Sequence, residues 1–279
     1  MTQTLSIIDQ IQQKIADSDV TLAPFDDVAV QIQQQASTQD FDIGKIEQLV
    51  LSDQALATEV LRAANSPFYG GLSKIQTVKN AIVRLGVQEV ANIVLMTTER
   101  AKYELRDPGL VAKTKPLWRH AVGVAVGAQW LAKRLGYGEI AHQAFIGGLI
   151  HDVGKLLLLC ILDDLMKDDD TPPFGEAVIE ELLASKHTEE GYRLAQQWNL
   201  PEEYARVIKE HDAEQVAGDD ALLLMVRLAN HACHHLGIGL VGDESIELAS
   251  TEEAQQLCAG EIVLAELEIT LEDSKELHP

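Results

Sequence analysis

Apolar residues recur every three or four positions along nearly the whole chain, which is the spacing of amphipathic helices. No convincing run of alternating apolar and polar residues accompanies them. In the first part of the chain this spacing predicts helices at about 25–32, 46–50, 56–61, 77–86 and 87–103. Pro67 and the two glycines after it predict the loop between the third and fourth helices. The pattern therefore predicts a helical N-terminal half of about five or six helices.

The same periodicity continues through the second part of the chain. It predicts helices at about 116–136, from 138 onward, and at 174–184, 187–198, 201–210 and 221–236. Asp107-Pro-Gly predicts a loop before the first of these. Beyond Gly242 the chain is acidic, and one or two docked helices are expected there, anchored by Ile246, Leu248, Ile262, Leu264 and Leu267. We therefore predict an all-α fold in three parts: residues 1–110, 111–240 and a C-terminal extension at 241–279.

The amino-acid composition limits the classes of partner that this helical protein is expected to bind. The 279 residues include 44 acidic and 22 basic side chains, for a formal net charge of −22. Such a surface repels phosphate backbones and anionic lipid, so neither nucleic acid nor a membrane is an expected partner. The first residues lack the basic and apolar regions of a signal peptide. Three cysteines without a CxxC pair suit a reducing compartment, and a cytoplasmic location is predicted.

The most informative residues are His151 and Asp152, adjacent on a predicted apolar helix in the run Ala144-Phe-Ile-Gly-Gly-Leu-Ile-His-Asp-Val-Gly-Lys. An imidazole and a carboxylate are costly to bury unless they are hydrogen-bonded or bind a metal. His120, His187 and the pair His211-Asp212 each lie on a predicted helix of their own. Histidine and carboxylate ligands suit iron, manganese, zinc or nickel, so the set indicates a candidate metal site.

Each of these residues also has a purely structural interpretation. His120 and His151 can be hydrogen-bonded core histidines, and His187 can be an ordinary surface residue. A cationic His211 at a helix C-terminus is favourable on electrostatic grounds alone. Lys155, one turn after His151, either contacts a phosphate beside the metal or extends from an apolar helix to solvent. A second cluster, His231, His234 and His235, precedes a helix end and is expected to be mostly solvated.

Several longer motifs point to one family. They are Val60-Leu-Arg-Ala-Ala-Asn-Ser-Pro-Phe-Tyr-Gly, Ile75-Gln-Thr-Val-Lys-Asn-Ala-Ile-Val-Arg-Leu-Gly, Trp118-Arg-His, His151-Asp-Val-Gly-Lys, and Trp198-Asn-Leu-Pro followed by His211. With these motifs the chain resembles the HDOD family, a branch of the HD-domain metal-dependent phosphohydrolase superfamily, from about Thr21 to His235. The resemblance implies an all-helical HDOD fold, with a helical N-terminal half packed on an HD-like bundle.

The resemblance also implies a set of ligands. The superfamily's metal ligands match His120, His151, Asp152 and, where a final Asp is usual, Asn230. The related HD-GYP phosphodiesterases have further histidines that match His187 and His211, with a second His where this chain has Asp212; their Gly-Tyr-Pro signature is missing here. Because Asn230 brings no negative charge, a vestigial or altered site is implied, with partial occupancy by a divalent metal (Fe, Mn, Ni, Zn or Mg).

Two functions follow as hypotheses. The first is a bacterial signalling module that acts through protein–protein contacts, without catalysis, on a partner such as a kinase or a response regulator. The motif Asn65, Ser66, Pro67, Phe68 and Tyr69 would then be the partner-binding segment. The alternative is a metal-dependent phosphohydrolase acting on a nucleotide or cyclic nucleotide, with Lys155 as the phosphate contact and Asp212 as general base.

Overall fold

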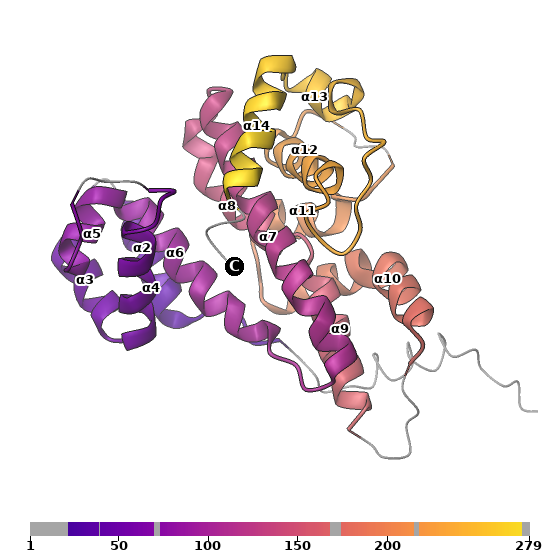
Figure 1. The fold of residues 1–279 in the computed structure, drawn as a ribbon, viewed down its shortest axis with the longest axis horizontal. Coiled ribbons are helices and arrows are strands. Elements are labelled where there is room, and N and C mark those ends of the chain that lie inside the picture. Colours follow the sequence, from indigo (N-terminus) through magenta and orange to yellow (C-terminus); the bar gives the residue numbers. More distant parts are fainter. Residues whose placement is uncertain (1–21, 39, 70–72, 168–173, 215–217, 275–279) are drawn as a thin grey trace, which may run out of the picture.

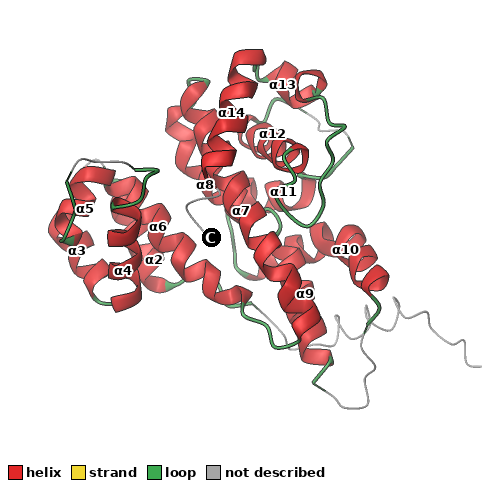
Figure 2. Ribbon diagram, in the orientation of Figure 1, coloured by secondary structure: helices red, strands yellow, loops and turns green. Residues whose placement is uncertain are grey.

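The computed structural model describes residues 22–38, 40–69, 73–167, 174–214 and 218–274. Within these ranges the regular secondary structure is entirely helical (Figures 1 and 2). The prediction of an all-α fold is confirmed. The signal-peptide prediction concerns residues 1–21, which lie outside the described ranges.

Five α-helices form an N-terminal unit that lies to one side of the molecule (Figure 1). They are α2 (Asp27–Ala36), α3 (Ile43–Leu51), α4 (Gln54–Ala64), α5 (Val78–Leu85) and α6 (Val87–Arg100), which continues into a short 3-10 turn at Ala101–Tyr103. Side chains of Asp26, Asp42, Asp53 and Thr77 accept hydrogen bonds from the first free N–H groups of α2 to α5 and so fix where each helix begins. Gly86, with a φ of 85°, forms the sharp turn from α5 into α6.

Six further helices form the bundle that holds the candidate site. They are α7 (Pro108–Arg134), α8 (Ala141–Ile150), α9 (Val153–Leu165), α10 (Glu176–Gln197), α11 (Glu202–Glu210) and α12 (Ala221–His235). The predicted helix that carries His151 and Asp152 is interrupted there, because these two residues form the turn between α8 and α9.

Two other predictions for this region were wrong. Asp107-Pro-Gly is a helix start and not a loop: the Asp107 side chain caps the N–H of Leu110, and Pro108 occupies the first turn, where its missing N–H costs nothing. Pro116 therefore lies inside α7. The two helices predicted at 174–184 and 187–198 are the single helix α10, since no Gly or Pro separates them and one continuous stripe of buried residues runs through both.

The C-terminal extension docks on the bundle. It consists of a 3-10 turn at Leu248–Ser250, α13 (Glu252–Gln256) and α14 (Glu261–Ser274), and α14 packs against α7 and α12 (Figure 1). Leu267 and Leu271 are buried against Gly127 of α7, where a Cβ atom would come within 3.0 Å of Leu271. Ile262 was expected to be an anchor, but it is 72% exposed.

Two hydrophobic clusters share the long helix α7. One contains residues of the N-terminal unit together with the first half of α7, α9 and α10, and the other contains the second half of α7, α12 and α14. The first cluster crosses the boundary expected near residue 110, so the two halves share a core. The domain limits themselves stay a prediction.

One stretch of the described chain, Gly138–Leu165, is long and apolar enough to cross a membrane by composition alone. However, 83% of its most apolar window is buried inside the fold. Helices α5 and α6 pass the same test only as a pair, and they are bent by 114°. Burial of this kind is typical of the core helix of a soluble protein.

Candidate metal centre

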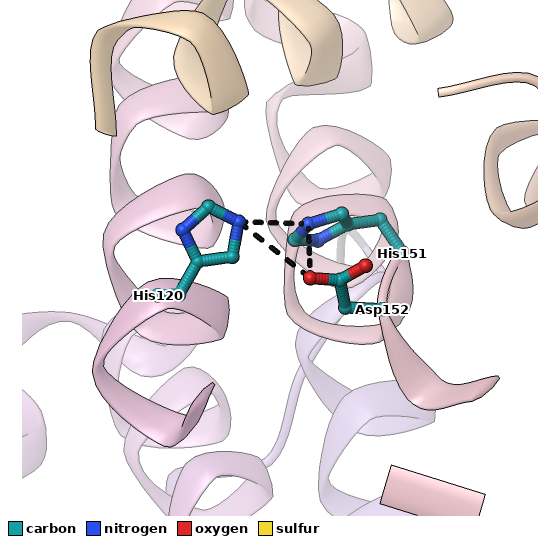
Figure 3. Close-up of side chains that lie close together, drawn as sticks. All are labelled: His120, His151 and Asp152. Carbon is teal, nitrogen blue, oxygen red and sulfur yellow. Dashed lines mark hydrogen bonds and ion pairs between the residues drawn. The ribbon is translucent and has the colours of Figure 1, made fainter. Parts of the chain in front are cut away.

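Four separate elements bring the predicted ligands to one place. His120 comes from the middle of α7, His151 and Asp152 from the α8–α9 turn, His187 from α10, and His211 from the residue after α11. All five side chains are buried. Figure 3 shows His120 and the His151-Asp152 pair facing one another from neighbouring helices. The convergence expected of these five side chains on one site is present.

Close helix crossings at glycines make this convergence possible. A Cβ atom on Gly148 would lie 2.6 Å from the Cα atom of Ala125, so α8 crosses α7 with the backbones in contact. A Cβ atom on Gly154 would lie 1.9 Å from the carbonyl oxygen of His187, so α9 crosses α10 equally closely. The two crossings hold the α8–α9 turn between His120 on one side and His187 on the other.

Asp152 lies at the centre of the cluster. Its Oδ2 atom is 3.6 Å from His120 Nε2 and 3.4 Å from His151 Nε2. Its Oδ1 atom is 3.6 Å from His187 Nε2 and 3.3 Å from His211 Nε2. The two oxygens therefore face two different pairs of histidines. Asp152 occupies a position where Asp usually caps the next helix, but its side chain makes no cap bond to α9.

Backbone carbonyls fix the protonation of three of these rings. The Nδ1 atoms lie 2.9 Å from the carbonyl oxygen of Ile238 for His120, 2.7 Å from that of Gly148 for His151, and 3.0 Å from that of Ile208 for His211. A carbonyl only accepts, so each Nδ1 is the protonated donor, and in the neutral ring each Nε2 presents a lone pair.

The centre of the cluster is consequently rich in acceptors. The Nε2 atoms of His120 and His151 are 3.2 Å apart, and both lone pairs face a carboxylate. The buried Oδ1 atom of Asp152 and the buried Oδ1 atom of Asn230 receive no hydrogen bond. Acceptors at such distances repel one another unless a cation lies among them. The residues present thus fit a divalent metal, in two groups that share Asp152: His120, His151 and Asp152, and Asp152, His187 and His211.

The pKa values agree with a neutral His120 ring beside a charged Asp152 carboxylate. Burial, reinforced by the neighbouring His151, lowers the pKa of His120 to about 3. Burial alone would raise the pKa of the Asp152 carboxyl, but Lys155, with its Nζ 2.8 Å away, helps to hold that pKa well below its usual range. Lys155 stays charged, because Asp152 raises its pKa against the effect of burial.

Asp212 lies at the open side of the cluster, with 43% of its side chain exposed. Its Oδ2 atom is 3.2 Å from His187 Nε2, and the Asn230 amide donates to its Oδ1 at 3.2 Å. Burial would raise the pKa of Asp212, but the adjacent His187 and His211 lower it, so Asp212 is an anion. Asn230 is itself buried, and its hydrogen bond to Asp212 places it at the edge of the centre.

The expectation that His231, His234 and His235 are mostly solvated was wrong. All three are half-buried, because the extension covers the end of α12. His231 lies 3.6 Å from Glu253 and His235 lies 3.6 Å from Glu268. The His234 ring lies 5.0 Å from that of His120, between centroids, and is held by the Val241 carbonyl. No periodicity in the sequence signals this.

A pocket of about 280 Å³ opens beside the centre. Its polar lining includes Lys113, Lys155, Glu180, His187, Asp212 and His234, and its apolar lining is Leu183, Ala184, Leu240 and Val241. Three larger hollows in the described chain are lined by the N-terminal unit, one of them together with Thr114, Lys115 and Trp118 of α7, and none contains a cluster residue.

The segment proposed for partner binding, Asn65 to Tyr69, lies far along the chain from the centre, after α4. The Asn65 side chain bonds both the N–H and the carbonyl of Ile75 and so closes the loop. The Tyr69 hydroxyl bonds Glu89, and Ser66 and Pro67 lie between the two. Phe68 packs edge-on against Tyr69 and is 37% exposed. Partner binding here stays a prediction.

Fold and site together describe an all-helical protein with a buried histidine–aspartate centre. The family model of the HDOD domain matches residues 22–214. The chain therefore belongs to the HDOD domain family, as its motifs predicted. The match ends before α12, so Asn230, His234 and the C-terminal extension lie beyond the matched region.

Solved structures of similar fold extend over nearly the whole chain. An HDOD domain protein of unknown function from Geobacter sulfurreducens has a TM-score of 0.74 at 23% identity, with 97% of this chain and 96% of that chain covered. A Shewanella amazonensis SB2B protein named as a candidate metal-dependent phosphohydrolase has a TM-score of 0.67 at 15% identity, covering 95% and 98%. At these identities the likeness establishes the HDOD fold.

An uncharacterized protein of Treponema pallidum (strain Nichols) is 26% identical over 218 residues, which is 75% of this chain. This chain spans 40% of the length of that relative.

Proposed function

We propose that this HDOD chain is a metal-dependent phosphohydrolase rather than a module with a vestigial site. The observation that carries the proposal is the set of lone pairs around Asp152, where three Nε2 atoms with backbone-fixed tautomers face one carboxylate. A site that had lost its metal in evolution would be free to fill this space with donors or apolar groups, which cost less to bury.

Each ligand has a distinct place in the proposed site. His120, His151 and Asp152 would hold one ion, and Asp152, His187 and His211 a second, with Asn230 able to offer only a neutral oxygen. When bound, such ions supply an activated water and a clamp on phosphate oxygens. Histidine-rich ligation favours Mn, Fe, Ni or Zn over Mg. The uncharged Asn230 makes partial occupancy the expected state of the purified protein.

The neighbouring pocket supports a phosphate ester as substrate. Lys155 and Lys113 place two ammonium groups in its wall, although Lys113 also pairs with Glu176 and Glu180. Asp212 at its edge is placed to act as general base. Leu183, Leu240 and Val241 form an apolar side suited to a base or another flat group. A nucleotide or cyclic nucleotide of the bacterial cytoplasm has a phosphate for the lysines and a base for the apolar side. The net charge of −22 opposes binding of a polynucleotide.

The test is turnover by the metal-loaded protein. Protein reconstituted with Mn²⁺, Fe²⁺, Ni²⁺, Zn²⁺ or Mg²⁺ is incubated with nucleoside monophosphates, cyclic nucleotides and nitrophenyl phosphate esters. We expect hydrolysis with at least one of the first four ions, and a loss of about 100-fold or more in His151→Ala. Absence of turnover with every ion, in protein shown by elemental analysis to carry metal, would exclude the hydrolase.

A signalling role through protein contacts remains the second candidate, and Phe68 is the observation that favours it. Its ring lies at the surface next to Tyr69, whose hydroxyl bonds Glu89 of α6, and Asn65, three residues earlier, bonds the N–H of Ile75. A partly exposed aromatic ring is a common anchor of protein interfaces. A bacterial kinase or response regulator is the proposed partner.

This role predicts that Phe68→Ala weakens partner binding by about 30-fold, the equivalent of about 2 kcal/mol, while metal binding is unchanged. The measurement is binding to a panel of purified kinases and response regulators from the same cell. Val83, which is 70% exposed on α5 of the same unit, provides the matched control as Val83→Ala. Equal binding by both variants and the parent chain would count against Phe68 as the anchor.

A further inference from the structure

A buried ion pair links the C-terminal extension to the bundle. Arg227 of α12 donates from Nε to Glu253 Oε1 of α13 at 2.7 Å. The side chains of Arg227 and Glu253 are only 7% and 5% exposed. Glu253 also lies 3.6 Å from His231. The first turn of α13 is thereby tied to the middle of α12.

The other end of the same guanidinium reaches the candidate metal centre. Arg227 Nη1 donates to the carbonyl oxygen of Glu210 at 2.9 Å and to that of His211 at 2.8 Å. These are carbonyls at the C-terminal end of α11, where a helix leaves its last acceptors without internal partners. Together with the bond from the His211 N–H to the Val207 carbonyl, these two bonds fix the backbone position of His211. The ring, which Nδ1 also ties to the Ile208 carbonyl, moves with that backbone.

The three groups form one chain of contacts from the extension to a proposed ligand. Glu253 holds the planar guanidinium in the orientation in which Nη1 meets both carbonyls, since Arg presents its donors in a rigid fork. Without the carboxylate, a buried Arg227 would lose its counter-charge and turn toward solvent or another acceptor. On the opposite side of the centre, His120 and His151 bond to the carbonyls of Ile238 and Gly148 and have no bond to this pair.

We infer that Glu253 and Arg227 are positioning residues that set the geometry of His211, so that the C-terminal extension controls one half of the metal centre. The inference rests on the proposed function in assuming that the centre binds metal. It concerns residues outside the segment 22–214 that defines the family. The Glu253 carboxylate acts only through Arg227 and touches neither metal nor substrate.

The experiment is calorimetric titration of the metal-free full chain with Mn²⁺. His120→Ala and His211→Ala, each of which leaves one group of three ligands intact, assign the two binding steps. In Glu253→Ala we expect the ion of the His187–His211 half to bind about 10- to 100-fold more weakly, while the ion of the His120–His151 half binds as before. Glu253→Gln, which keeps an acceptor for Arg227 Nε, should recover part of the loss.

The matched control is Glu266→Ala. Glu266 also joins the extension to the bundle, through Arg134 of α7 at 2.7 Å, but the side chains of Glu266 and Arg134 are 43% and 44% exposed and neither contacts the centre. We expect both binding steps of this variant to equal those of the parent chain. A purely structural role of Glu253 would lower thermal stability and weaken both steps alike, and that result, or no change in either step, would overturn the inference.

A second measurement keeps the inference testable without metal. Imidazole ¹⁵N spectra of the metal-free chain report the Nδ1–H tautomer of each ring. In Glu253→Ala the His211 signals should shift or broaden, while those of His120 should not move. If the parent chain binds none of Mn²⁺, Fe²⁺, Ni²⁺ and Zn²⁺, the proposed function fails, but the His211 spectrum still decides whether Glu253 sets the position of His211. Unchanged His211 signals would refute that role of Glu253.

Discussion

Asp152→Asn is expected to abolish binding of both metal ions while leaving the protein folded. One oxygen of Asp152 faces His120 and His151, and the other faces His187 and His211. A single amide in its place removes the shared negative charge from both groups of ligands. It also offers N–H donors to the histidine lone pairs, which offsets part of the cost of leaving Lys155 without its counter-charge, so the metal-free variant should stay folded with a modest loss of stability. We expect affinity for Mn²⁺ to fall by a factor on the order of 100 or more at both steps.

Asp163→Asn is the control, because Asp163, on α9, is another buried carboxylate. It accepts hydrogen bonds from the N–H groups of Arg106 and Asp107 at 3.0 and 2.8 Å and has no contact with the centre. This variant should have a lower free energy of unfolding but should bind both metal ions with the affinity of the parent chain. Calorimetric titration and urea unfolding of the two variants give the comparison. An Asp152→Asn protein that retained one ion at full affinity would contradict the shared position of Asp152.

Gly154→Ala is expected to have the largest effect on the fold of any single methyl group added near the site. The new Cβ would lie 1.9 Å from the His187 carbonyl oxygen and 2.8 Å from the Gly191 nitrogen, both of which are backbone atoms. Because neither can rotate away, α9 and α10 must separate. We expect a loss of at least about 3 kcal/mol in the free energy of unfolding, above the usual cost of overpacking. His187 would move with α10, and its half of the metal centre would be lost.

Gly138→Ala provides the contrast. A Cβ atom at Gly138 meets nothing within 4 Å, so this change should leave stability within about 0.5 kcal/mol of the parent value. Unfolding in urea measures both variants. Similar stability of the two alanine variants would mean that the α9–α10 contact is looser than described.

The residues of the centre were predictable from the sequence, because buried His and Asp side chains are rare and the HDOD motifs give their order. The helices were predictable where glycines and capping residues delimit them, as at Thr77 and Gly86. The single helix α10 was missed because charged residues around Lys186 hid a continuous buried stripe. The helix start predicted at Pro116 was too late, because α7 begins more than two turns earlier, after the capping residue Asp107.

Contacts between segments that are far apart in the sequence could not be predicted. Nothing local to Gly154 indicates that α10 crosses there, and nothing local to Glu253 indicates that it meets Arg227. His234 looked solvated because its neighbours in sequence are polar or end the helix, whereas its neighbours in space are His120 and the Val241 carbonyl. These contacts depend on packing, which a hydrophobic pattern does not specify.

The bond between His120 and the carbonyl of Ile238 has a consequence for how such chains diverge in evolution. The acceptor that orients this ring is a backbone atom, so it places no demand on the residue type at position 238. The demand falls on the next residue, Gly239, which has a φ of 140° and where a Cβ atom would come within 3.0 Å of His120 Nδ1. The bond also demands that the loop after α12 follow the same path. Two relatives with identical histidines can therefore differ in whether the His120 ring is oriented toward the centre. Insertions or deletions in the loop after α12 would be the mutations that cause this difference.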